Sequence, residues 1–263
     1  MHLGRRLHDV DAPSFEEALA KVQAQGFHSI QLAPTKSLNF TRDMLSPGYG
    51  RYLRQALDSH ALDVAILGSY FDLSDRGPSR EETLNRYKDH LLLAHYADFK
   101  VVGTETGKIM PDDSQYEEAF QAVKENLGVI LDQAEKLGIV VAIEPVYGHT
   151  IYNREKMEEL LEAYPGRNLQ VIYDPVNLLD PTDEAGAPAM WKDFLEHLGN
   201  RLAAVHVKDY VIEDGKKRDL PAGTGRMDYS HLFNLAQKKP YLDFLIEAAK
   251  DENISSIMEN FGG

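Results

Sequence analysis

The chain has 263 residues, of which 43% are hydrophobic, and 42 acidic against 28 basic residues give it a formal net charge of −14. This length suits one large hydrophobic core, so we predict a single domain over residues 1–263. The acidic charge argues against a nucleic-acid partner. The sequence has no cysteine, which excludes disulfides and thiolate sites. No apolar run is long enough for a signal peptide or a membrane span, so we expect a soluble, cytoplasmic protein without a membrane partner.

Short apolar runs alternate with helix-like segments along the first half of the chain. Strands are predicted at 3–7, 29–33, 63–68 and 101–107. Helices are predicted at 13–27, near 50–60, at 79–96 and at 114–137. Ser14 and Glu17 have the spacing of an N-terminal capping box, and Gly26 and Gly138 are stop signals for the first and fourth helices. A polar loop is expected around residues 35–39.

The alternation continues through the second half of the chain. Strands are predicted at 139–144, 169–174, 203–209 and 241–247. Helices are predicted at 153–164, 188–199, 230–237 and 251–261. Eight repeats of about 30 residues predict an α/β fold in which a parallel sheet closes into a (β/α)8 TIM barrel. The loop at 211–228 is too long and too rich in glycine and charge for a plain connector, which favours a functional role.

Four consecutive predicted strands end in, or carry near their ends, side chains that bind metals. They are Glu144, Asp174, His206 and Glu247. The C-terminal ends of parallel strands lie on one rim, where carboxylates and an imidazole can share one divalent cation. Glu259 is a rival for the fourth position, but a barrel strand should be followed by its helix and only four residues follow Glu259. Contact with solvent explains a polar residue at any one strand end, but explains four less readily.

Several motifs together resemble a known family. In chain order they are AIEPVYGH, YDPVNLL, HVKD, PAGTGRMDY and PYLDFLIE, and they cover essentially the whole chain. The set resembles the sugar phosphate isomerase and epimerase family with a xylose isomerase-like barrel. The resemblance implies a divalent metal on the four rim residues and an active site at the C-terminal rim. It also implies chemistry at a carbon beside a carbonyl or hydroxyl of a small sugar or polyol.

The residues themselves fit this chemistry. Removal of a proton beside a carbonyl leaves an enediolate, whose two oxygens can chelate one metal ion. Oxygen-rich ligation with one imidazole favours Mn²⁺ or Mg²⁺, with Zn²⁺ or Co²⁺ as further possibilities. Glu144 and Glu247 lie roughly opposite each other across the predicted barrel mouth. One of them can remove a proton and the other return it, as an epimerase requires, while return to the neighbouring carbon gives isomerisation.

Other polar residues are candidates around this centre. Lys208 follows His206 by two residues and points to the same side of the strand, so it can act on an enediolate oxygen or support the ligand shell through Asp174. The candidate substrate-binding residues are His8, Glu105, His149, Asn177 and Arg226. The resemblance places Asn177 where some relatives have a histidine. This departure leaves a single metal site intact and removes a substrate or second-metal contact.

Three alternatives stay open. A dehydratase of a keto-polyol would use the same centre. An apurinic-site endonuclease is disfavoured, because that chemistry in the family uses three zinc ions and extra histidines, whereas the third and fourth strand ends carry Ser69, Tyr70, Thr104 and Glu105. A barrel that binds a polyol without turnover is the third alternative. The sequence does not decide the substrate, its phosphorylation, the native metal or whether the chain forms a homo-oligomer.

Overall fold

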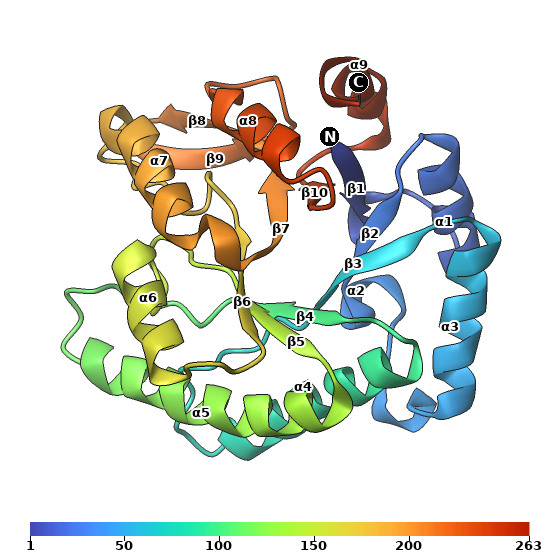
Figure 1. Cartoon of the computed structure of the whole chain (residues 1–263), viewed down its shortest axis with the longest axis horizontal. Coiled ribbons are helices and arrows are strands. Elements are labelled where there is room, and N and C mark those ends of the chain that lie inside the picture. The colour runs from blue at the N-terminus through green and yellow to red at the C-terminus, as the bar shows by residue number, and fades with distance from the viewer. Residues whose placement is uncertain (263) are drawn as a thin grey trace.

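The computed structural model describes residues 1–262, in which eight parallel strands close into a central barrel (Figure 1). The strands are β1 (His2–Arg6), β2 (Ser29–Leu32), β3 (Asp63–Gly68), β4 (Val101–Thr104), β5 (Val140–Ile143), β6 (Leu169–Tyr173), β7 (Leu202–Val207) and β10 (Asp243–Ile246). The barrel closes where β1 pairs with β10, with His2 opposite Asp243 and Arg5 opposite Ile246. The predicted (β/α)8 TIM barrel is confirmed.

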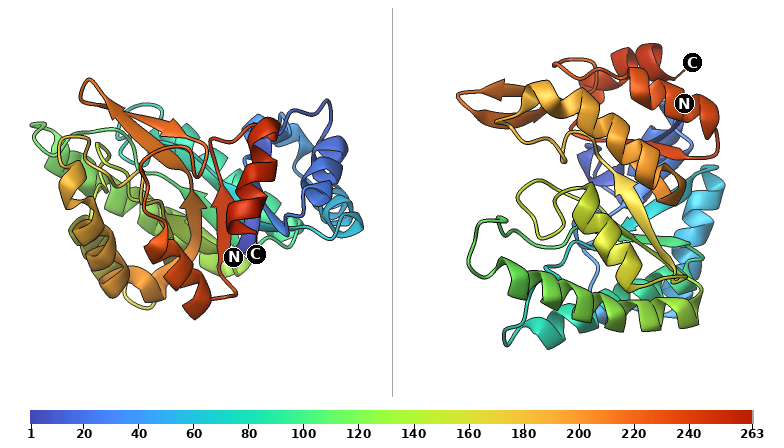
Figure 2. Two further views of the ribbon diagram at one scale, coloured as in Figure 1. Left: turned by 90° about the horizontal axis from the view of Figure 1, so that it is seen from above. Right: turned by 60° about the vertical axis from the view of Figure 1, so that its left-hand side comes forward.

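Helices cover the outside of the barrel, and the two chain ends lie near each other (Figure 2). The helices are α1 (Phe15–Ala24), α2 (Pro34–Ser37), α3 (Pro47–Ser59), α4 (Arg80–Tyr96), α5 (Tyr116–Leu137), α6 (Arg154–Ala163), α7 (Ala187–Leu198), α8 (Ser230–Lys238) and α9 (Ile254–Phe261). Short 3-10 turns lie at Leu7–Asp9, Arg42–Met44, Glu184–Gly186, Gly199–Arg201 and Asp251–Asn253. Over residues 1–262, no helix is long and apolar enough to span a membrane.

Helix ends follow local capping chemistry. Ser14 Oγ accepts a hydrogen bond from the Glu17 amide at 3.2 Å and begins α1. Gly138 ends α5 with φ of +69°, a left-handed conformation that glycine adopts without a steric cost. Helix α3 begins earlier than predicted, because Ser46 Oγ accepts a hydrogen bond from the Tyr49 amide at 3.2 Å. The next residue, a proline, is already in the helical φ range.

The long loop predicted at 211–228 is partly ordered as a β-hairpin. Strand β8 (Asp209–Glu213) pairs antiparallel with β9 (Lys216–Leu220), and the hairpin extends outward from the barrel (Figure 2). Asp214 and Gly215 form its turn with φ of +51° and +71°. Asp-Gly is a strong signal for a two-residue hairpin turn, which the sequence-based prediction did not use. The run predicted as one strand at 203–209 is therefore divided between β7 and β8.

The barrel has two apolar cores, one inside the ring of strands and one outside it. A small cluster packs inside the barrel and consists of Ile66, Ala142, Ile172, Ala204 and Leu245. At Gly103 a Cβ atom would lie 2.6 Å from Ile172 Cδ1, so a side chain there would collide with this cluster. A larger buried core lies between the strands and the surrounding helices. Side chains fill the interior, so the barrel has no open channel. The strands are parallel, so their polar C-terminal ends meet at one mouth.

Candidate active site

The four predicted metal ligands converge at the C-terminal mouth of the barrel. Glu144, Asp174 and Glu247 directly follow β5, β6 and β10, while His206 lies within β7. All four residues are at most 3% exposed. Glu259, the predicted rival of Glu247, lies on the exposed surface of α9. The eighth barrel strand therefore delivers Glu247 to the mouth, as the sequence-based assignment of that strand expected.

The ring of His206 faces carboxylate oxygens from three other strands. Its Nδ1 atom lies 3.3 Å from Glu144 Oε2, 3.7 Å from Asp174 Oδ2 and 3.6 Å from Glu247 Oε1. Among residues 1–262, neither ring nitrogen has a hydrogen-bond partner. Ligands that each lie about 2.1 Å from one cation are about 3 Å or more apart from each other. These separations suit atoms that share a cation better than atoms that share hydrogen bonds.

Three of the four predicted ligands form a tighter group. One ligand atom each from Glu144, Asp174 and His206 lies within 4.8 Å of the other two. Glu247 lies outside this tighter group, and its Oε1 atom is 3.4 Å from Arg6 Nη1 as well as 3.6 Å from His206 Nδ1. Glu247 therefore lies between His206 and a cation from β1.

Buried charges at the centre compensate one another. Burial alone would lower the pKa of His206, but the carboxylates of Glu247 and Glu144 outweigh it and hold that pKa well above 6.5. The same balance acts on Lys208, where burial opposes and Asp174 and Glu247 hold the pKa well above 10.5. Without a metal ion, the cluster therefore contains a protonated His206 ring and a protonated Lys208 among its carboxylates.

Asp174 is fixed by the start of its own loop. Its Oδ1 atom accepts hydrogen bonds of 2.9 Å from the amides of Val176 and Asn177, which leaves Oδ2 3.0 Å from Lys208 Nζ. Burial would raise the pKa of Asp174, but Lys208 and His206 hold it well below its usual range. This carboxylate stays ionised and oriented toward the centre.

Asn177 connects two of the charged groups. Its Nδ2 atom donates a 2.7 Å hydrogen bond to Glu144 Oε1, and its Oδ1 atom accepts a 2.9 Å hydrogen bond from Lys208 Nζ. The amide therefore orients Glu144 and leaves Glu144 Oε2 directed at His206. Asn177 was predicted as a substrate-binding residue, and the contact that the structure shows is with Glu144 and Lys208.

A cavity of about 410 Å³ opens above this centre. It contains four of the five predicted substrate-binding residues, namely His8, Glu105, His149 and Asn177, together with Glu144, Lys208 and Glu247. Arg226 does not line it. The guanidinium of Arg226 instead lies 3.1 Å from Glu184 Oε2 on the outer loops. The structure therefore does not place Arg226, a predicted substrate-binding residue, at this cavity.

Three titratable side chains that line the cavity, Glu105, His149 and His8, carry less than a full charge at pH 7. Burial, with repulsion from Glu144 and Glu247, raises the pKa of Glu105 from 4.5 to about 7. Burial and the Lys108 cation lower the pKa of His149 to about 4. Burial and Arg6 lower the pKa of His8 to about 4. These side chains can exchange hydrogen bonds with hydroxyl groups without adding a full charge.

Asp209 of the HVKD motif binds the backbone of the glycine-rich loop that follows it in the sequence. Its carboxylate accepts hydrogen bonds from the amides of Tyr210 at 2.8 Å, Gly225 at 2.8 Å and Met227 at 2.9 Å. A Cβ atom on Gly225 would lie 2.2 Å from the Tyr210 carbonyl oxygen, so this approach requires glycine. Asp209 therefore anchors the 223–227 loop beside the hairpin.

Several residues of the cavity were not predicted from the sequence. They are Arg6, Lys36, Lys108 and Asp219. Asp219, on β9, places Oδ2 3.0 Å from Lys208 Nζ and thereby ties the hairpin to the site. The Asp-Gly turn could have revealed the hairpin, but no periodicity or motif marks the two lysines.

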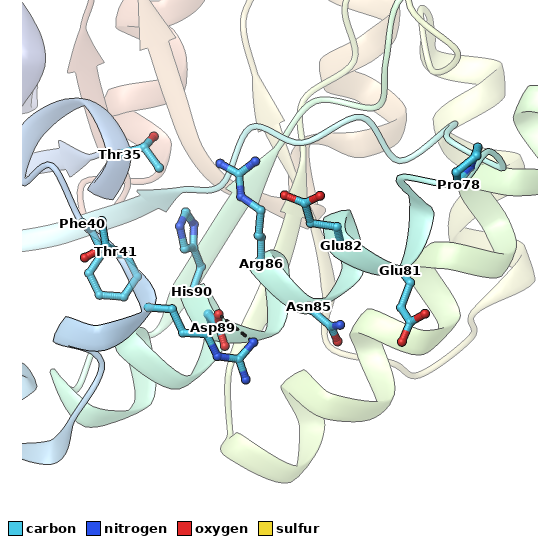
Figure 3. A pocket seen from close by; sticks show the side chains of 11 residues that line it. Thr35, Phe40, Thr41, Pro78, Glu81, Glu82, Asn85, Arg86, Asp89 and His90 are labelled. Carbon is cyan, nitrogen blue, oxygen red and sulfur yellow. Dashed lines mark ion pairs between the residues drawn. The ribbon is translucent and has the colours of Figure 1, made fainter.

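A second, larger hollow of about 690 Å³ lies outside the barrel between α4 and the segment 35–42 (Figure 3). Its floor includes the buried ring of His90, and Arg42 Nη1 lies 3.5 Å from Asp89 Oδ2 across it. None of the four predicted metal ligands lines this hollow. The larger hollow is therefore separate from the predicted site.

Comparisons with known proteins agree with this architecture. The model of the xylose isomerase-like TIM barrel family matches residues 19–260. No curated protein sequence matches the chain significantly. Among solved structures, a D-tagatose 3-epimerase-like protein aligns with a TM-score of 0.78 and 20% identity, covering 100% of this chain and 96% of that one.

Two further structures extend the comparison. The probable 3-DHS dehydratase AsbF from Bacillus anthracis aligns with a TM-score of 0.79 and 16% identity, over 100% of this chain and 99% of that one. The IolI protein with a bound zinc atom aligns with a TM-score of 0.75 and 16% identity, over 97% and 91% of the two chains. These identities establish a shared fold, while the family match extends over most of the sequence. The chain therefore belongs to the xylose isomerase-like TIM barrel family.

Proposed function

We propose that this protein is a divalent-metal-dependent isomerase or epimerase of a small sugar or polyol, acting by proton transfer beside a carbonyl. The observation that supports this most is the His206 ring, whose Nδ1 atom faces three carboxylate oxygens at 3.3–3.7 Å and has no hydrogen-bond partner in the described part of the chain. A buried nitrogen with no partner is costly unless something binds it. A cavity of about 410 Å³ directly above provides room for a sugar.

The donor set fits a divalent cation held by Glu144, Asp174, His206 and Glu247. Three carboxylates and one imidazole favour Mn²⁺ or Mg²⁺, and do not exclude Zn²⁺ or Co²⁺. Such an ion would act as a Lewis acid that polarises the substrate carbonyl and disperses negative charge. Asn177 and Lys208 would keep two of these ligands, Glu144 and Asp174, in place through the contacts described above.

Glu144 and Glu247 are the proposed proton carriers. They approach His206 from β5 and β10, so a substrate lying between them presents a different face to each carboxylate. In an epimerisation, one glutamate removes the proton from carbon and the other returns a proton to the opposite face. In an isomerisation, the proton returns to the adjacent carbon. Lys208 Nζ, 3.4 Å from Glu247 Oε2, can stabilise negative charge that develops near that carboxylate.

A dehydratase is the second candidate, and Glu105 is the observation in its favour. With a pKa of about 7, this carboxyl is half protonated at neutral pH and lines the same cavity as the two glutamates. A protonated carboxyl can donate its proton to a leaving hydroxyl, which departs as water. Both reactions begin with removal of the proton beside the carbonyl. The dehydratase then releases water, whereas the isomerase or epimerase returns a proton to carbon.

Turnover in D₂O by the metal-loaded protein tests the proposal. A panel of ketoses, aldoses and their phosphates is incubated with enzyme, and deuterium incorporation and product mass are measured. We expect solvent deuterium at the carbon that loses its proton, and turnover reduced by orders of magnitude in Glu144→Gln and Glu247→Gln. A product lighter by one water would select the dehydratase. No exchange and no mass change with any member of the panel would contradict both enzymatic proposals.

A further inference from the structure

The mouth of the cavity is divided into two sectors by the strand order. The ligand-bearing strands β5, β6, β7 and β10 are neighbours, and β1 to β4 complete the ring. Two lysines reach the cavity from this second sector. Lys36 lies in α2, directly after β2, and Lys108 lies four residues after β4. A substrate with its reacting end at Glu144 and Glu247 therefore has its other end toward the lysines.

These lysines differ from the other cations of the cavity. Arg6 is paired with Asp9 and Glu247, and Lys208 with Asp174, Asp219 and Glu247. Within residues 1–262, neither the Lys36 nor the Lys108 ammonium group has an ion pair or hydrogen bond. Both are exposed at the mouth. They are thus positive charges whose contacts are free for a ligand.

Both lysines have neighbours that line the same cavity. Lys36 Nζ lies 5.5 Å from the centroid of the Tyr70 ring, and Tyr70 lines the cavity beside the glutamates. The backbone of Lys108 forms an isolated antiparallel bridge with that of His149. The His149 Nδ1 atom lies 3.6 Å from Glu105 Oε2. Both lysines therefore line the same cavity as the proposed proton carriers, so the remote end of a short substrate can reach them.

We propose that the substrate of this site carries a phosphate or carboxylate group at the end remote from its reacting carbons, and that Lys36 and Lys108 bind this group. This inference rests on the proposed function, because it takes Glu144 and Glu247 as the reacting end. On a chain with a formal net charge of −14, an anionic substrate is repelled at long range, and two unpaired lysines provide the local attraction it needs. Because Arg6 is already paired with Asp9 and Glu247, the two lysines are the cations on this side that can bind the anion.

Calorimetric binding to the metal-loaded protein tests the inference without requiring turnover. The probes are D-fructose, D-fructose 6-phosphate and D-fructuronate, which differ at C6 by a hydroxyl, a phosphate and a carboxylate. We expect at least one anionic sugar to bind about tenfold or more tightly than D-fructose, and added salt to weaken that binding. Preference for the phosphate or for the carboxylate then identifies the anion.

Lysine variants link the preference to these two residues. Lys36→Gln and Lys108→Gln should each weaken binding of the preferred anionic sugar about fivefold to tenfold, and the double variant more, with D-fructose changed less than about twofold. Lys136→Gln is the matched control, because this exposed lysine ends α5 at the opposite end of the barrel. Metal content and circular dichroism report whether the variants are folded.

The outcomes separate this inference from the proposed function. Equal binding of the three sugars, binding of none, or an anion preference that survives in the double variant would overturn the inference about Lys36 and Lys108. Failure of the proposed function would appear elsewhere, as a lack of deuterium exchange and of mass change across the whole substrate panel. Selective anion binding that disappears in the double variant would support the inference in either case.

Discussion

The two sectors of the barrel mouth are built differently. On the β5, β6, β7 and β10 side, the four proposed ligands are at most 3% exposed and face one another at close range. On the β1–β4 side, the Glu105 side chain is 35% exposed, and both Lys36 and Lys108 are exposed. The first sector has its charges compensated internally, while the second presents unpaired donors to the cavity.

This difference separates two tasks. A cation needs ligands held in place before it binds, and buried carboxylates anchored by Asn177, Lys208 and backbone amides supply that rigidity. A substrate needs groups that choose it, and exposed side chains on rim loops can vary without disturbing the barrel. The comparison therefore predicts that changes in the buried sector affect metal binding and folding, whereas changes in the open sector affect substrate choice and the response to pH.

Loss of a ligand in the buried sector should have the largest effect. Asp174→Ala and His206→Ala each remove one of four donors and leave an incomplete shell, so we expect metal affinity to fall by more than about a thousandfold. Metal analysis and titration measure this directly. Glu259→Gln on α9 is the control and should bind normally. Full occupancy in both alanine variants would show that the metal site lies elsewhere.

Removal of the buried cation should be the next largest effect. Lys208→Met leaves Asp174 and Glu247 without their ammonium partner, and breaking such a buried pair costs roughly 3–5 kcal/mol. Urea unfolding of the metal-free variant should show this loss. A divalent ion would neutralise the same carboxylates, so it should stabilise the variant more than the wild type. Unchanged stability of the metal-free variant would mean that the Lys208 ammonium does not compensate the buried charges of Asp174 and Glu247.

The pH dependence of metal binding follows from His206. Its pKa is held well above 6.5 by the carboxylates, so in the metal-free protein the ring carries a proton at neutral pH. A metal ligand must be neutral imidazole, so binding releases about one proton, and affinity should rise about tenfold per pH unit below the raised pKa. Titrations from pH 6 to 8, in buffers with different ionisation enthalpies, measure both quantities. A flat profile without proton release would exclude His206 as a ligand.

Glu105 in the open sector should give the smallest effect. Its pKa is raised from 4.5 to about 7, so the folded metal-free protein is favoured by protonation and loses stability as pH rises from about 4.5 through 7. Glu105→Gln should therefore gain on the order of 1 kcal/mol at pH 8, after allowance for the screening of a partly exposed group. No gain is expected near pH 4.5. An equal effect at both pH values would point to packing instead of charge.

Sequence-based prediction succeeded where the fold itself dictates position. Parallel strands of one barrel deliver their C-terminal ends to one rim, so Glu144, Asp174, His206 and Glu247 could be grouped from strand assignments alone. The rim loops obey no such rule. Arg226 was predicted as a substrate-binding residue, but it lies beside Glu184, because Asp209 folds that loop back onto the hairpin.

Lys36 and Lys108 were not predicted, for the same physical reason. Lys36 and Lys108 reach the cavity through loop conformations such as the short helix α2 and the bridge to His149. These conformations depend on tertiary contacts and leave no periodic pattern in the sequence. Asn177 was recognised as a departure from a histidine, but its bridge between Glu144 and Lys208 required the three-dimensional arrangement.

The central claim is that one divalent cation is shared by the four buried residues at the mouth. Anomalous diffraction from crystals soaked in Mn²⁺ tests it most directly. We expect one strong peak per chain, about 2.0–2.3 Å from His206 Nδ1 and from oxygen atoms of Glu144, Asp174 and Glu247. A peak that excludes His206, or no peak at this mouth at saturating Mn²⁺, would contradict the account.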